Sequence, residues 1–463
     1  MQFPLHSAPE WDFLWGLGRM PFTDRYGLEL STTSARAADL YARGLDHALA
    51  AEAPAEACFA DAFAEDPSFA LAAIGQARML QFRGMAVQAR ELANRARGLA
   101  PAATRRERQH IACIGTAIGG DSPAALALLK AHLEEFPRDA FALSQACGVY
   151  GLIGFSGRVD RNDEQLAILE PLAAAYGDDW WFLSQIAFAY NELFRHEEAR
   201  KATDRSLAGN PRNGHAAHTM AHIGYETGDP AAGADFMREW LVGYDPAHQL
   251  YGHNYWHLAL FELAAGNMDE VLSLYDRILK PSVTTSTALG SVADAASLLW
   301  RCTLTERPAE DLPWQELAEW SAKAFPRAGM VWADAHCLLA WCATNDRDRL
   351  ATLVGQLRDR VAGGKIYAGS MLVDLAEAYS AYAVGDWDHA ANLLETTRSE
   401  VIRLGGSHAQ RDVFEETLIE ACVRAGRIGR ATNLLKQRLD RRHNGRDRRW
   451  LEHINQRHAA TPV

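Results

Sequence analysis

The sequence predicts an all-α protein, a solenoid of helix pairs that stack along one axis. Prolines recur at about the length of one helix pair, with separations of 34, 36, 74, 35 and 35 residues (101 − 67 = 34 for the first), at Pro67, Pro101, Pro137, Pro211, Pro246 and Pro281. A fixed period of this length indicates a repeat array, because one helix pair cannot bury its apolar face alone. Alternating Val/Ile/Thr strand patterns are scarce, whereas alanine-rich helical periods run almost from end to end.

Each repeat carries two stop signals, which place its two helices in order. Proline ends a helix because it lacks an N–H and disfavours helical geometry in the residue before it. About midway through several repeats stands a glycine that can supply the positive φ of a helix C-cap: Gly84, Gly228, Gly266, Gly385 and Gly426. Each repeat is therefore expected to run as helix, glycine turn, second helix and closing proline.

With these elements the chain resembles the tetratricopeptide repeat (TPR) superfamily over roughly residues 36–440. The matching stretches are Gly385-Asp386-Trp387-Asp388-His389-Ala390, Gly266-Asn267-Met268-Asp269-Glu270-Val271 and His196-Glu197-Glu198-Ala199. More narrowly, it is similar to the tetratricopeptide repeat protein 38 family in residues 215–222, 252–260, 294–301 and 410–412. The resemblance implies a closed superhelix in which the first helix of each pair lines the concave face.

The chain divides into three parts in this prediction. Residues 1–35 are aromatic and irregular and are expected to fold back on the array as an N-terminal cap. Residues 36–441 form the TPR-like superhelix, and residues 442–463 form a C-terminal tail.

Composition excludes several classes of function. A net charge of −12 argues against nucleic acid as a partner, because binding phosphate requires clustered Lys and Arg. Seven cysteines without a CxxC pair fit free thiols in a reducing compartment. The chain has neither a signal-peptide pattern nor a stretch of about 20 apolar residues, so we expect no membrane association and a cytoplasmic location.

Two histidine motifs stand 35 residues apart. The first is His215-x-x-His218-x-x-x-His222, and the second is His253-x-x-x-His257, with 253 − 218 = 35 and 257 − 222 = 35. Residues three, four and seven apart share one face of a helix. Both motifs follow a repeat-closing proline, so both should lie on first helices and face the same inner surface.

Further polar residues begin other first helices, and the inside of one superhelical turn could gather them around one cavity. We assign catalytic roles to His218, His222, His253, His257 and Asp294, and the first four of these are also candidate metal ligands. We assign substrate binding to His215, Trp256, Asp334, His336, His408, Arg411 and Asp412.

Three interpretations of the histidines remain open. Two HxxxH pairs with an aspartate could hold a divalent metal such as zinc, iron or manganese, although Thr219 and Asn254 replace the glutamate of an HExxH metalloprotease motif. A metal-free site would use a histidine oriented by an aspartate as general base, with Arg411 holding an anionic group. In the third interpretation, the histidines bind a peptide or one another without chemistry.

The favoured interpretation is a protein that binds a small molecule in a histidine-rich concave pocket. We extend this interpretation to a hydrolase-type enzyme, with or without a metal. The alternative is a non-catalytic scaffold that binds a peptide or protein partner. Homo-oligomerisation is left open.

Overall fold

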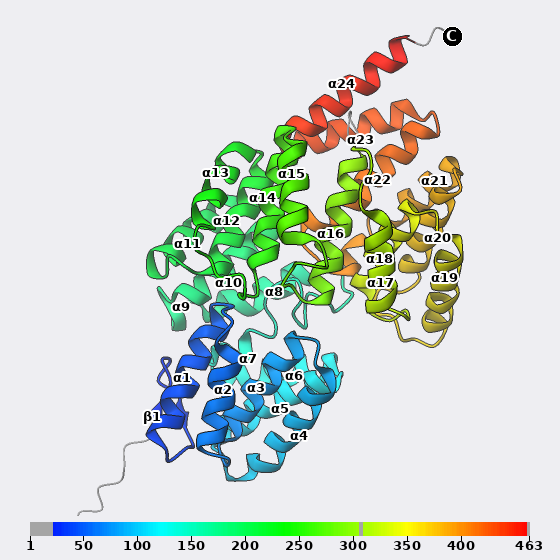
Figure 1. Cartoon of the computed structure of the whole chain (residues 1–463). Coiled ribbons are helices and arrows are strands. Elements are labelled where there is room, and N and C mark those ends of the chain that lie inside the picture. The colour runs from blue at the N-terminus through cyan, green and yellow to red at the C-terminus, as the bar shows by residue number, and fades with distance from the viewer. Residues whose placement is uncertain (1–21, 305–308, 461–463) are drawn as a thin grey trace, which may run out of the picture.

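Helices make up almost all of the computed structural model, which describes residues 22–304 and 309–460, with side chains to residue 456 (Figure 1). Within the described ranges the only strands are two of two residues each, β1 (Phe22–Thr23) and β2 (Glu29–Leu30), which pair antiparallel. The all-α prediction is confirmed. No helix in these ranges combines the length and the apolar character that a bilayer crossing needs.

The N-terminal lobe follows the small hairpin. Its helices are α1 (Ala35–Leu49), α2 (Ala55–Glu65), α3 (Ala70–Phe82), α4 (Ala86–Leu99), η1 (Ala100–Ala102), α5 (Arg105–Gly119), α6 (Ser122–Glu135) and α7 (Ala140–Leu143). Arg106 of α5 donates to the Glu29 carbonyl, and Tyr26 is buried, so the described part of the predicted N-terminal cap packs on this lobe. Residues 1–21 lie outside the described residues.

The second and larger part of the array runs to the C-terminus. Its first half contains α8 (Arg161–Leu169), η2 (Glu170–Leu172), α9 (Ala173–Tyr176), α10 (Trp180–Glu192), α11 (His196–Gly209), α12 (Gly214–Thr227), α13 (Pro230–Trp240), α14 (Tyr251–Ala265), α15 (Met268–Leu274) and the π-turn η3 (Tyr275–Leu279). Its second half contains α16 (Ala288–Thr303), α17 (Trp314–Ala324), α18 (Val331–Ala343), α19 (Arg347–Ala362), α20 (Met371–Ala383), α21 (Trp387–Thr397), η4 (Val401–Leu404), α22 (His408–Arg424), α23 (Ile428–Arg441) and α24 (Gly445–Ala460).

The helices form two layers, as expected for TPR-like pairs. Each first helix packs against its own partner and against the first helix of the next pair, so α10, α12, α14, α16, α18 and α20 make one continuous inner layer. All six predicted prolines lie at or just after the end of a second helix. The predicted turn glycines all have positive φ, for example 76° at Gly228 and 88° at Gly266.

The array is interrupted between α7 and α8. The helix α7 is only four residues long, and residues 144–160 form a glycine-rich loop in its place. Tertiary packing requires glycine at Gly157, because a Cβ there would lie 2.4 Å from the Tyr367 carbonyl oxygen. The buried apolar residues form two core clusters, and the division between them lies further along the chain: one runs from Tyr26 to Ala202 and the other from Ala217 to Ile454.

The superhelix closes through α22, which lies inside the turn formed by α12–α20. Thr417 of α22 accepts a hydrogen bond from Trp300 Nε1 at 2.9 Å and shares another with the Tyr379 hydroxyl at 2.9 Å. Glu416 pairs with Arg301 at 3.4 Å, and Phe414 packs edge-on against His336. The inner face of this stretch is therefore covered by the chain itself.

The predicted C-terminal tail is a helix. Residues 445–460 form α24, whose Trp450 and Ile454 belong to the larger core and whose Asp447 is fully buried. Asp447 accepts a hydrogen bond from the buried Arg438 at 2.9 Å, which fixes the helix to α23.

Candidate functional site

Four histidines from two parallel inner helices meet at one point. His218 and His222 come from α12, and His253 and His257 come from α14. The ring centroids of His218 and His253 are 4.9 Å apart, and those of His222 and His257 are 4.4 Å apart. One ring nitrogen of each lies within 4.8 Å of the others. The convergence expected from the spacing of 35 residues is confirmed, while the role of the cluster stays a prediction.

The repeat register explains why the pairing works. The C-cap glycines of α12 and α14 are 38 residues apart (266 − 228 = 38), whereas the facing histidines are 35 apart. The difference of three residues is close to one helical turn of 3.6 residues. The same helix face therefore carries the histidines whether the repeats are aligned on their closing prolines or on their turn glycines.

Several imidazole nitrogens in the cluster lack a hydrogen-bond partner. His222 Nε2 lies 3.0 Å from His218 Nε2, so at most one of these nitrogens can carry the shared proton. Both nitrogens of His257 and Nδ1 of His222 have no partner among the described residues, although both rings are fully buried. An unsatisfied buried polar group costs about 1–3 kcal/mol. The arrangement indicates a ligand that binds these nitrogens.

Burial keeps the imidazoles of His215, His218, His222 and His257 neutral near pH 7. Burial lowers the pKa of His222 to about 3 and that of His215 to about 4. Burial, followed by the neighbouring imidazoles, holds the pKa values of His218 and His257 well below the ordinary histidine value. Neutral imidazole is the form that binds a metal ion, so no deprotonation opposes binding near pH 7.

Asp294 and two aromatic rings fix the orientation of the cluster. Nδ1 of His253 donates to the Asp294 carboxylate, with both oxygens at 3.0 Å, which leaves Nε2 as the free nitrogen of His253. The Trp256 ring stacks on His253 at 5.2 Å and 13°, and Phe188 stacks on His218 at 5.5 Å. A carboxylate that orients a histidine in this way is typical of metal sites and of general bases.

A cavity of about 200 Å³ opens beside the cluster. His218, His253 and Asp294 line it, and so does His215, whereas His222 and His257 lie deeper. Its walls include five aromatic side chains, Phe82, Phe141, Tyr150, Trp181 and Phe188, together with hydroxyl and amide groups such as those of Ser184, Gln185 and Thr219. The glycine-rich loop after α7 supplies part of this wall, including Tyr150. Of the predicted catalytic residues, His218, His253 and Asp294 therefore line the cavity, and His222 and His257 lie behind them. Trp256 packs against His253.

Two of the predicted substrate-binding residues lie elsewhere. Asp334, at the start of α18, accepts a hydrogen bond from the Gly329 N–H at 2.9 Å. Nδ1 of His336 donates to the Trp332 carbonyl at 2.7 Å, and its ring packs against Phe414. Neither lines the histidine cavity, so their assignment to it is wrong. The physical reason is that Phe414 of α22 packs against the His336 ring, while the Asp334 carboxylate is held by the turn that precedes its own helix.

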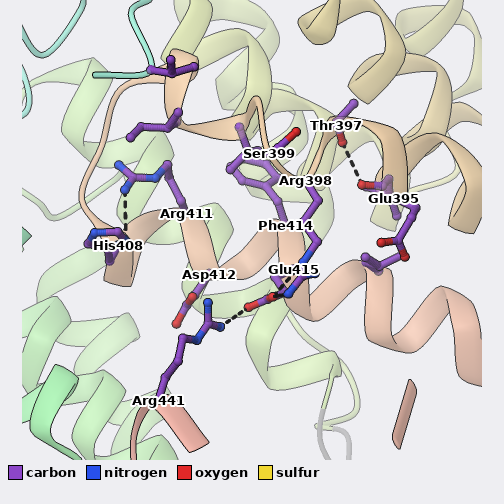
Figure 2. Close-up of a pocket in the computed structure, with 15 residues that line it drawn as sticks. Glu395, Thr397, Arg398, Ser399, His408, Arg411, Asp412, Phe414, Glu415 and Arg441 are labelled. Carbon is purple, nitrogen blue, oxygen red and sulfur yellow. Dashed lines mark hydrogen bonds and ion pairs between the residues drawn. The ribbon is translucent and has the colours of Figure 1, made fainter. Parts of the chain in front are cut away.

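His408, Arg411 and Asp412 line a different pocket of about 600 Å³ (Figure 2). Arg411 donates to the Gly406 carbonyl and Asp412 pairs with Arg442. These charges are used to hold α22 in place, which corrects their expected role in the histidine cavity. Arg411 in particular does not face that cavity to hold an anion.

The buried carboxyl group of Asp334 leads to a pH-dependent prediction. Burial raises its pKa to about 6, so the folded state binds the proton more tightly than the unfolded chain does. Stability should therefore fall as the pH rises from about 4 to about 6. Asp334→Asn is expected to be about 1–3 kcal/mol more stable than the parent at pH 8 and nearly equal to it at about pH 3.5, as measured by urea unfolding. The exposed Asp359→Asn serves as the control, and an equal gain at both pH values would contradict the explanation.

A second cluster has the composition of a metal site but different bonding. His110 Nδ1 and His132 Nε2 lie 3.0 and 3.1 Å from Asp139 oxygens, and Arg106 pairs with the same carboxylate at 3.0 Å. Burial opposes ionisation of Asp139, but His110 and Arg106 hold its pKa well below the usual value. Because these partners satisfy the carboxylate, we interpret this cluster as structural.

Two residues near the site were missed in the sequence. Arg78 of α3 lines the cavity, and Glu192 at the end of α10 lies between the deep histidines and α22, where it accepts from the His408 N–H at 3.3 Å. A signal existed for Arg78, since it interrupts the otherwise apolar face of a buried first helix. No sequence signal marked Glu192, because its partners are more than 200 residues away.

No protein-family model matches the chain. Among solved structures it is similar to yeast Tom70, with 14% identity, 92% of this chain and 95% of that chain covered, and a TM-score of 0.33. It is also similar to the human IFIT1 dimer with m7Gppp-AAAA, with 12% identity, 95% and 98% coverage, and a TM-score of 0.38. These TM-scores carry no inference about function. The described helices confirm the prediction of an all-α solenoid of helix pairs.

Proposed function

We propose that this chain binds a small molecule in the histidine cavity, at a metal centre held by His218, His222, His253 and His257. The observation that carries the proposal is the fully buried His257 ring, neither of whose nitrogens has a hydrogen-bond partner among the described residues. A histidine kept for packing would be paired through at least one nitrogen, as Nδ1 of His110 is paired with Asp139 while its Nε2 has no partner among the described residues.

The donor set fits a first-row divalent metal. Two metal–nitrogen bonds of about 2.0–2.1 Å span at most about 4.2 Å, and the four nitrogens already lie within 4.8 Å of one another. The Asp294 carboxylate supports His253 from behind, as outer-shell partners of metal-binding histidines commonly do. Of zinc, iron and manganese, the all-imidazole set favours zinc or iron, because manganese prefers oxygen ligands.

Hydrolysis is the reaction class that we propose for this site. A metal ion bound beside the cavity would supply Lewis-acid polarisation and a water of lowered pKa. His218 and His253 line the cavity, so a substrate would approach from their side. The seven cysteines are all free and buried, which supports a cytoplasmic location as part of the proposal.

The narrower resemblance to the tetratricopeptide repeat protein 38 family also belongs to this proposal. It rests on residues 215–222, 252–260 and 294–301, which carry the four histidines and Asp294. The fourth stretch of this resemblance, residues 410–412, lies on α22 and outside the histidine cavity.

The scaffold alternative is supported by the fold class, since solenoids of helix pairs offer extended concave surfaces for partners. In this chain, however, α22 covers the inner face from α16 to α20 through Thr417, Glu416 and Phe414. A peptide or protein partner would have to bind another surface. For this reason we place the small-molecule site first.

The test is metal analysis of protein purified without a metal-affinity column. We expect about one equivalent of zinc or iron per chain, loss of the metal on dialysis against a chelator, and a visible absorption spectrum on loading with Co²⁺. Metal at 100 times its Kd should add about 2.7 kcal/mol to the free energy of unfolding. A metal content near zero with no Co²⁺ spectrum and no stabilisation would contradict the metal centre.

A further inference from the structure

A buried arginine without a counter-ion lines the same cavity. Arg78 of α3 is 9% exposed, and no carboxylate within the described ranges forms an ion pair with it. Its Nη1 donates to Gln81 Oε1, its guanidinium lies 4.1 Å from the centroid of the Phe82 ring, and its Nε has no partner. Removing a lone cation from water costs several kcal/mol, and neither an amide oxygen nor a ring face neutralises its charge.

Several other buried arginines of this chain have carboxylate partners, whereas Arg161, which has none within the described residues, donates to the Gly154 and Gly406 carbonyls. Arg106 pairs with Asp139, Arg301 with Glu416 and Arg438 with Asp447. Burial lowers the pKa of Arg78 to about 10, which still leaves the guanidinium protonated at neutral pH. The cavity therefore offers a fixed positive charge at a position where the protein itself supplies no anion within the described residues.

We propose that Arg78 binds the carboxylate of a small organic acid whose apolar body lies among the aromatic walls and whose other end contacts His218 and His253. This inference rests on the proposed function, since it names the ligand class of the same cavity. The guanidinium fork matches a carboxylate through two parallel hydrogen bonds.

The rest of the cavity selects the ligand further. Arg78 is the only lysine or arginine among the described lining residues, so the site suits one negative charge rather than a doubly charged phosphate ester. Phe82, Phe141, Trp181 and Phe188 favour an apolar, aromatic body over a sugar or a polyol. A volume of about 200 Å³ restricts the ligand to a small acid.

The first experiment compares a matched pair of probes on the full chain by isothermal titration calorimetry. We expect 3-phenylpropanoate to bind at least 10-fold more tightly than 3-phenylpropanamide, which has the same shape without the charge. A pentapeptide with a C-terminal phenylalanine tests whether a peptide supplies the carboxylate instead. Equal binding of acid and amide, or tight binding of the peptide without binding of the small acid, would overturn the proposal.

The second experiment uses variants. Arg78→Met should lose the preference for the acid over the amide, and Arg78→Lys should recover part of the preference. The matched control is Arg95→Met, which removes an exposed arginine that lies 4.4 Å from the centroid of the Phe63 ring. The control should bind both probes as the parent does. If Arg78→Met does not fold, the comparison of acid and amide on the parent protein still decides the matter.

Metal content separates this inference from the proposed function. Arg78-dependent binding of the acid, together with no uptake of Zn²⁺ or Co²⁺ by the same protein, would support the carboxylate site and contradict the metal centre. Metal-loaded protein that does not distinguish acid from amide would contradict the carboxylate site and leave the metal centre standing.

Discussion

Replacing His257 with alanine is expected to lower the affinity for Zn²⁺ by at least about 100-fold. Losing a residue that only supports a metal ligand lowers metal affinity by roughly 10–100-fold, and losing a ligand itself should cost more. His257 supplies one of the four converging nitrogens and makes no hydrogen bond with described residues. Its truncation should therefore cost the metal-free protein less than the about 2–5 kcal/mol of a large-to-small core change. Competition with a chromogenic chelator measures the affinity, and urea unfolding measures the stability.

The matched control is His110→Ala in the second cluster. His110 is as deeply buried as His257 but donates to Asp139, so its loss should destabilise the fold without changing the metal affinity. If His257→Ala retains full affinity, or if His110→Ala loses it, the four histidines are not the metal centre.

Arg438→Ala is expected to lower the free energy of unfolding by about 3–5 kcal/mol. The fully buried guanidinium donates to Asp447 at 2.9 Å, to Glu416 at 3.1 Å and to Glu415 at 3.1 Å, and so connects α22, α23 and α24. Its removal leaves buried carboxylates without a counter-charge. Urea unfolding at pH 7 measures the loss.

Arg441→Ala is the control for this prediction because Arg441 lies on the same helix and contacts the same Glu415 at 2.6 Å. Its side chain is 50% exposed, so the pair should contribute less than about 1 kcal/mol. Similar losses in the two variants would mean that burial of the charge network does not determine the stability of the closing helices.

The histidine cluster was predictable because its geometry depends on local rules. A spacing of 35 residues on first helices of adjacent repeats aligns the His218 and His253 faces, and the neighbour contact between α12 and α14 follows from the repeat itself. His336 and Arg411 were misplaced for the opposite reason. Their surroundings depend on α22 returning to the inside of the superhelix, and no repeat spacing encodes that return.

The sequence by itself determined the all-α class, the order of helix, glycine turn and closing proline, and the pairing of the two histidine motifs, because each follows from backbone preference and helical periodicity. Only the tertiary structure decided that the C-terminal residues form α24, that α22 covers the inner face, and that Arg78 of the N-terminal lobe faces the same cavity as His218 and His253. These features depend on contacts between segments far apart in the chain. Their free energy comes from burial and charge pairing, which local sequence patterns do not specify.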